Sequence, residues 1–92
     1  MSINVVAIRL TGGSKHEHIS HLWWLGHEDG KPGDAPRADV VAWIEKGGRA
    51  YVRDDQGHDV GVHVVTPPSG PKYLQTWADG IWTDNLLSLP RR

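Results

Sequence analysis

The stretch DVGVHVVT, at Asp59–Thr66, has the clearest strand pattern in the chain. Its valines recur at every second position, at Val60, Val62 and Val64. Successive side chains of a β-strand point to opposite faces, so these three valines share one face. The alternation therefore predicts a β-strand with one face in the core.

Further strands are predicted on both sides of this one. Upstream, RAYVR at Arg49–Arg53 predicts a short strand, joined to it by a hairpin turn at Asp54–Gly57. Downstream, three prolines make Thr66–Pro71 a rigid surface loop. The next strand is expected at Lys72–Trp77, and it turns back into Ile81–Trp82.

One helix is predicted before these strands, after an irregular loop at Gly26–Pro36. Asp34 is expected to cap the helix, with Pro36 in the first turn, and Gly47 and Gly48 are expected to end it. A helix of about ten residues is too short to stand alone, so we expect it to pack on the sheet. Its apolar stripe consists of Val40, Val41, Trp43 and Ile44.

The N-terminal part of the chain predicts a β-hairpin. INVVAIRL, at Ile3–Leu10, is rich in β-branched residues and has apolar residues on both faces, which favours a central strand. A glycine-containing turn at Thr11–Ser14 leads to a second strand at His16–Leu25. The element order β-β-α-β-β-β predicts an α+β fold, with one helix packed on a mainly antiparallel sheet of four to five strands. We expect residues 1–92 to form one domain.

The composition excludes several classes of chemistry. The chain has no cysteine, which excludes disulfides, thiolate metal sites and iron–sulfur clusters. Ten Lys and Arg against eleven Asp and Glu give a net charge of −1, which provides no strong field for a nucleic acid or an anionic membrane. No segment is long and apolar enough to span a bilayer and none has the pattern of a signal peptide, so we expect a cytoplasmic protein that binds no membrane.

The C-terminal third carries a distinctive ending. Lys72–Thr76, Asp79–Gly80 and Thr83–Leu87 are followed by Leu89–Pro90, in the pattern YLxT..DG..TDNLLxLP. With this ending the chain resembles a family of short, uncharacterised bacterial and phage proteins that are described only as a domain of unknown function. The resemblance covers most of the chain; it implies a single domain and assigns no catalytic residue. The leucines of the ending are expected to anchor the C-terminus on the core.

The chain has five tryptophans and no phenylalanine, which is more indole than a core of this size is expected to bury. Trp23 and Trp24 are adjacent on a predicted strand, so one of them faces away from the core in either register. Exposed indoles are typical of protein interfaces. We therefore expect a non-enzymatic interaction module whose partner is another protein, either a host protein or a second copy. Its expected contact residues are the aromatics of the sheet, Trp23, Trp24, Tyr51, Trp77 and Trp82.

A weak single-stranded nucleic-acid-binding protein is the first alternative. Unpaired bases would stack on the same aromatic side chains, and arginines would contact the phosphates. The candidate arginines are Arg49, Arg53, Arg91 and Arg92. They are interleaved with about as many acidic residues, so the sequence favours a protein partner.

A histidine-dependent metal site is the second alternative. His16 and His18 are two residues apart on a predicted strand and would share a face. The fold would have to bring His63 or Glu17 near them as a further ligand. The sequence holds no nucleophile elbow, phosphate-binding loop or dinucleotide-binding motif. We therefore expect no enzymatic activity and no cofactor.

Overall fold

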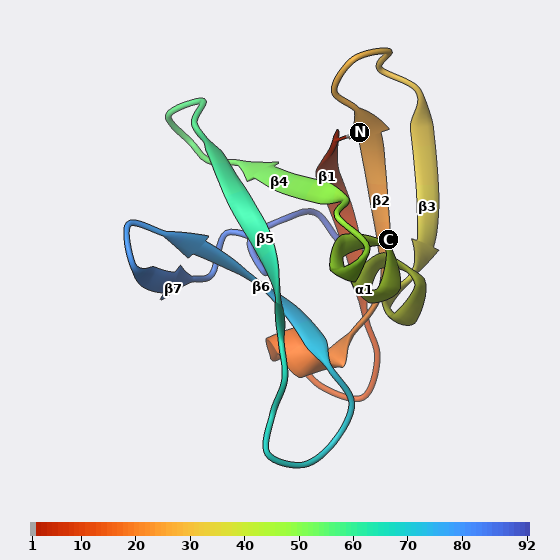
Figure 1. Ribbon diagram of the computed structural model, residues 1–92, viewed down its shortest axis with the longest axis vertical. Coiled ribbons are helices and arrows are strands. Elements are labelled where there is room, and N and C mark those ends of the chain that lie inside the picture. The colour runs from red at the N-terminus through yellow and green to blue at the C-terminus, as the bar shows by residue number, and fades with distance from the viewer. Residues whose placement is uncertain (1) are drawn as a thin grey trace.

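The computed structural model describes residues 2–92 as one seven-stranded sheet with one α-helix (Figure 1). The elements are β1 (Ser2–Leu10), a 3-10 turn η1 (His16–His18), β2 (Ile19–Gly26), β3 (Pro32–Pro36), α1 (Arg37–Glu45), β4 (Arg49–Arg53), β5 (Asp59–Val65), β6 (Tyr73–Ala78) and β7 (Ile81–Thr83). The strand order is β3-β2-β1-β4-β5-β6-β7. All neighbouring strands are antiparallel except β1 and β4, which are parallel.

The expected α+β fold with a sheet of four to five strands is wrong, because the sheet is mixed and has seven strands. Two strands exceed the expected order: β7, which is the predicted return at Ile81–Trp82, and β3, which lies in the stretch Gly26–Pro36 that the sequence predicts as an irregular loop. β3 pairs with β2 and forms an edge of the sheet. Two prolines are tolerated there because the N–H that proline lacks is not needed on the free side of an edge strand.

Two local expectations near β2 are also wrong. Asp34 does not cap the helix, since it lies in β3, where its Oδ2 is 2.6 Å from Nε2 of His21 on β2. The cap position is held by Pro36, which makes no side-chain cap hydrogen bond. The second strand begins at Ile19, because residues 16–18 form the turn η1.

The helix α1 connects two strands that are not neighbours in the sheet. β3 leads into α1, and α1 leads into β4, which lies on the far side of β2 and β1. The strongly twisted sheet brings β5 and β6 to α1 as well, so that α1 contacts strands from both halves of the sheet (Figure 1). No helix in the described chain is long and apolar enough to cross a bilayer.

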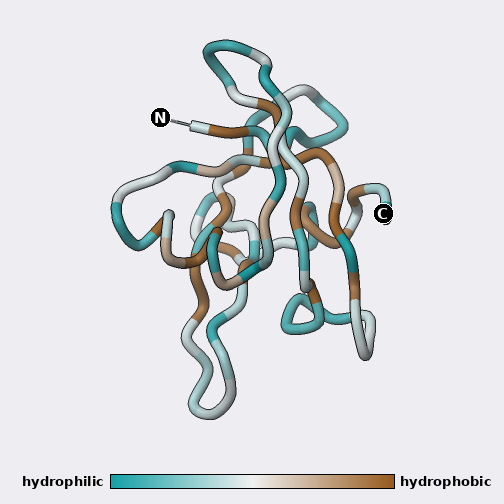
Figure 2. The backbone as a smooth tube through the Cα atoms, turned by 90° about the vertical axis from the view of Figure 1, so that its right-hand side faces the viewer, coloured by the Kyte–Doolittle hydropathy of each residue, from teal (hydrophilic) through white to brown (hydrophobic). Residues whose placement is uncertain are grey.

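The core lies between the helix and the inner face of the sheet, and we call the opposite side the outer face. Ile8, Ile19, Leu22 and Leu74 are fully buried there. In Figure 2 the hydrophobic segments lie mainly in the body of the molecule, whereas the loops that project from it are coloured hydrophilic or neutral. A register shift between Val5 and Ala7 changes which residues of β1 point inward, as a β-bulge does.

The segment after β7 returns to the core, as the leucines of the ending predict. Leu86 is fully buried, and Leu87 and Leu89 pack against the core. The N–H of Ile8 donates to the carbonyl of Pro90, and the N–H of Arg92 donates to the carbonyl of Ile8. Because β4 pairs only with residues 2–4 of β1, this tail covers a part of the β1 edge that β4 leaves open.

Candidate functional site

The hairpin formed by β6 and β7 carries most of the large hydrophobic side chains that are exposed in the described chain. Among residues 2–92 the large hydrophobic side chains that are exposed are Leu25, Trp77, Ile81 and Trp82. Three of these four belong to the hairpin, with exposed fractions of 37% for Trp77, 66% for Ile81 and 43% for Trp82. The indoles of Trp77 and Trp82 lie edge to face, with ring centroids 4.7 Å apart and planes at 83°.

The turn of this hairpin explains why the two indoles meet. Asp79 and Gly80 both have positive φ, of 52° and 81°, which is typical of the type I′ turn that Asp-Gly favours. Ala78 and Ile81 form the pair next to the turn, and Trp77 and Trp82 form the following pair. By the alternation of an antiparallel ladder, this second pair is not hydrogen-bonded, and such pairs bring side chains closer together.

The register of the sheet places four apolar or aromatic residues on the outer face. Asn4 pairs with both Leu25 and Tyr51, whereas Gly61 pairs with both Tyr51 and Trp77. Residues in one cross-strand row share a face of the sheet. The row therefore joins Leu25, Tyr51, Trp77 and Trp82 on one side of the molecule.

The structure resolves which of the adjacent tryptophans faces the core. Trp24 packs against the core, and Trp23 points to the outer face. The guanidinium carbons of Arg9 and Arg92 lie 5.2 Å and 5.1 Å from the ring centroid of Trp23. These distances are typical of cation–π contacts. Trp23 is half-buried, with two arginine side chains over its ring. Of the five expected contact residues, only Trp77 and Trp82 lie side by side and exposed.

The candidate arginines are largely occupied within the chain. Arg53 pairs with Asp59 at 3.4 Å, and Arg91 donates to the carbonyls of Leu87 and Leu89. Arg92 lies over Trp23, whereas Arg49 is exposed at the start of β4. They do not form one cationic surface beside the exposed indoles.

The candidate metal ligands are separated in the structure. His16 and His18 belong to a 3-10 turn, and His18 Nδ1 accepts the N–H of Lys15 at 3.1 Å. His63 lies on β5, with its ring centroid 6.3 Å from that of Trp82. Nowhere in residues 2–92 do three or more His, Cys, Asp or Glu side chains gather in a way that could hold a metal ion.

His16 is a buried polar residue with a ring nitrogen that is unpaired within residues 2–92. It is 9% exposed, and its Nε2 has no hydrogen-bond partner within the described chain. Its nearest charge is Asp84, whose Oδ1 lies 3.8 Å from that nitrogen. Burial lowers the pKa of His16, and the carboxylate of Asp84 opposes this shift. The ring borders a polar cavity with Ser14 and Tyr73, but no hydroxyl is bonded to it as a nucleophile would be to its base.

Acidification is expected to destabilise the protein through His16. Because its pKa is lowered in the folded state, the unfolded chain binds the proton more readily, and stability is lost as the pH falls below the usual histidine value of about 6.5. Urea unfolding at several pH values should show this loss of stability. His16→Gln should make the free energy of unfolding depend less steeply on pH over the same range. The matched change His63→Gln, at an exposed position, is the control. An unchanged slope in His16→Gln would show that another group causes the dependence.

The comparisons with known proteins leave the activity open. A family model described as "Protein of unknown function (DUF3892)" matches residues 4–90. No match to the chain was found among curated proteins or solved structures. The expectation of a family of unknown function is confirmed.

Proposed function

We propose that the chain, which belongs to the DUF3892 family of proteins of unknown function, is a non-enzymatic interaction module that binds through the free edge of β7. The observation that carries the proposal is the exposed group of Trp77, Ile81 and Trp82 on the last strands of the sheet. A bacterial or phage origin and a cytoplasmic location stay predictions.

The exposed side chains lie on both faces of the hairpin. Trp77 and Trp82 point to the outer face, and Ile81, the next residue along β7, points to the opposite one. A ligand that docks on one face would leave the other face exposed. A strand that continues the sheet beyond β7 would cover both, so the geometry favours edge pairing.

The backbone of β7 is suited to such pairing. Within residues 2–92 no strand pairs with its outer edge. Since Trp77 and Trp82 are not a hydrogen-bonded pair, the N–H and C=O of Trp82 point away from β6 and toward that edge. An incoming strand would find one donor and one acceptor there, flanked by apolar side chains.

The partner that we propose is a second copy of the chain. A strand can pair with its own copy in antiparallel orientation around a two-fold axis, with Trp82 next to the axis. The net charge of −1 gives little repulsion between copies. Because β7 has only three residues, the dimer is expected to be weak and to depend on concentration.

Sedimentation equilibrium over a range of concentrations tests this proposal. The mass should rise from 10.2 kDa toward twice that value, and Ile81→Lys should keep the protein monomeric because a charged side chain opposes edge pairing. Leu25→Lys is the matched control at another exposed apolar position and should dimerise like the unchanged protein. A monomer at every concentration, or dimers unaffected by Ile81→Lys, would contradict the proposal.

A further inference from the structure

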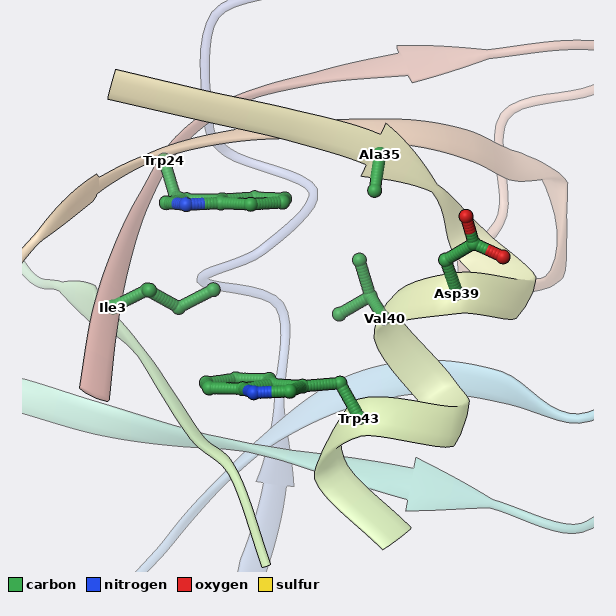
Figure 3. Close-up of a pocket in the computed structure, with 6 residues that line it drawn as sticks. All are labelled: Ile3, Trp24, Ala35, Asp39, Val40 and Trp43. Carbon is green, nitrogen blue, oxygen red and sulfur yellow. The ribbon is translucent and has the colours of Figure 1, made fainter. Parts of the chain in front are cut away.

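A second apolar site lies on the inner side of the sheet, away from the exposed hairpin. Trp24 of β2 and Trp43 of α1 face each other across a cavity of about 140 Å³ (Figure 3). Figure 3 shows both indoles edge-on, so that their faces are turned toward the space between them; the side chain of Ile3 reaches into this space from one side, and Val40 bounds it on the other. Ala35 and Asp39 complete the lining.

Two glycines hold the indoles in place. A Cβ added at Gly33 would lie 2.6 Å from Nε1 of Trp24, and one added at Gly48 would lie 2.3 Å from Cδ2 of Trp43. Real Cβ atoms do not approach other atoms so closely, so each ring rests directly on glycine backbone. The glycine backbone thus limits how each ring can move, and both rings line the cavity, which is a preorganised arrangement.

The lining selects for a particular kind of ligand. A dry apolar cavity of roughly 150 Å³ accepts a group the size of benzene, so this cavity accepts one compact group. The faces of indole rings attract cations, and tryptophan does so more strongly than tyrosine or phenylalanine. An unmodified ammonium group would lose hydrogen bonds to water in an apolar slot. In a methylated ammonium group, methyl groups replace the N–H donors. Such a group loses fewer hydrogen bonds to water when it enters the slot, and it keeps its positive charge.

Asp39 supplies the complementary charge. It is exposed in the first turn of α1, and no ion pair to it forms within residues 2–92. It is among the residues that line the cavity, and Figure 3 shows it beside Ala35, on the side of the cavity away from the two indoles. Asp39 is the one acidic residue in the lining, so a cation held in the cavity would have this carboxylate as its counter-charge.

We propose that the slot between Trp24 and Trp43 binds a methylated ammonium group, with Asp39 as its counter-charge. The group could be carried by a small molecule such as choline or by a methylated lysine of a protein, since both present the same chemistry. The site shares no side chain with the β7 edge, so its test does not depend on self-association.

Isothermal titration calorimetry with choline chloride tests the chemistry, and 3,3-dimethyl-1-butanol, in which carbon replaces the charged nitrogen, is the matched neutral probe. Choline should bind in the millimolar range or tighter, and the neutral probe should bind about two- to thirty-fold more weakly, the range of one cation–π contact. Equal binding of the two probes, or no binding of choline, would overturn the proposal.

Variants locate the site. Asp39→Asn should weaken choline binding by about two- to five-fold, whereas Asp55→Asn, at an exposed position in another turn, should have no effect. Trp43→Leu keeps an apolar side chain and should abolish binding, with circular dichroism as the check on folding. If Asp39→Asn and Asp55→Asn behave alike, the assignment of the counter-charge is wrong.

A short peptide with trimethyl-lysine, compared with the same peptide unmethylated, distinguishes the sources. Tighter binding of the methylated peptide than of choline would identify a protein side chain as the ligand, and the reverse would identify a small molecule. Preference for the unmethylated peptide would overturn the proposal, because the slot offers that ammonium group no acceptors in exchange for water.

Discussion

Leu86→Ala is expected to lower the free energy of unfolding by about 2–5 kcal/mol, the usual cost of removing a fully buried leucine side chain. Leu86 is fully buried and belongs to the core, although it lies in the segment that follows the last strand. For 92 residues a total stability of about 5–14 kcal/mol is typical. The loss would thus be a large part of the total, and urea unfolding monitored by circular dichroism would measure it.

Leu25→Ala is the matched control for this prediction. Leu25 is 41% exposed on the outer face, so the same chemical change should alter the stability by about 0.5 kcal/mol or less. Similar losses in the two variants would mean that the C-terminal segment does not contribute to the core as the structure describes. A small loss in Leu86→Ala would mean the same.

Thr76→Val is expected to cost about 1–3 kcal/mol, because it leaves buried polar partners without a hydrogen bond. Thr76 is fully buried on β6. Its hydroxyl donates to the carbonyl of Thr83 at 3.0 Å and accepts from the hydroxyl of Thr83 at 2.7 Å. Valine has the same shape but replaces the hydroxyl by a methyl group, so it tests these hydrogen bonds with little change in packing.

Thr76→Val should destabilise β7 more than the rest of the sheet, because the hydrogen bonds of Thr83 hold β7 on β6. Hydrogen–deuterium exchange should become faster at residues 81–83 than in β5, and urea unfolding should give the overall loss. Thr66→Val, at an exposed position in the loop after β5, is the control and should change the stability by about 0.5 kcal/mol or less. Unchanged exchange at residues 81–83 would show that these hydrogen bonds do not hold the edge strand.

Much of the second half of the fold was predictable from local sequence. The alternating valines of β5 and the Asp-Gly turn of the β6–β7 hairpin specify their structures with residues that are neighbours along the chain. β3 was not predictable in this way, because PGDAP has little strand propensity. It is a strand because it pairs with the edge of β2. This pairing depends on the tertiary structure and not on the local sequence.

The candidate site was predictable to a similar degree. The alternation of side chains along a strand correctly placed Trp23 and Trp24 on opposite faces. Only the tertiary packing determines that Trp24 is the one that points toward the core. Trp43 was expected in the apolar stripe of the helix, and it does pack against the core. Its position opposite Trp24 could not be predicted, since it depends on Gly33 and Gly48, whose contacts are made across the fold.

The expectation for the histidines failed for a physical reason. The strand assignment that placed His16 and His18 on one face was wrong, because the chain forms a 3-10 turn there before β2 begins. A turn of this type has three residues per turn, so side chains two residues apart do not share a face. The buried His16 therefore has Asp84 as its neighbour, not a second histidine.

Self-pairing of β7 can be followed through the indole N–H signals of the five tryptophans in a nitrogen-15-labelled sample. As the protein concentration rises, the nuclear magnetic resonance signals of Trp77 and Trp82 should move, while those of Trp23, Trp24 and Trp43 should stay in place. If no signal moves, or if the moving signals belong to the other three tryptophans, the edge of β7 is not the surface through which this protein associates.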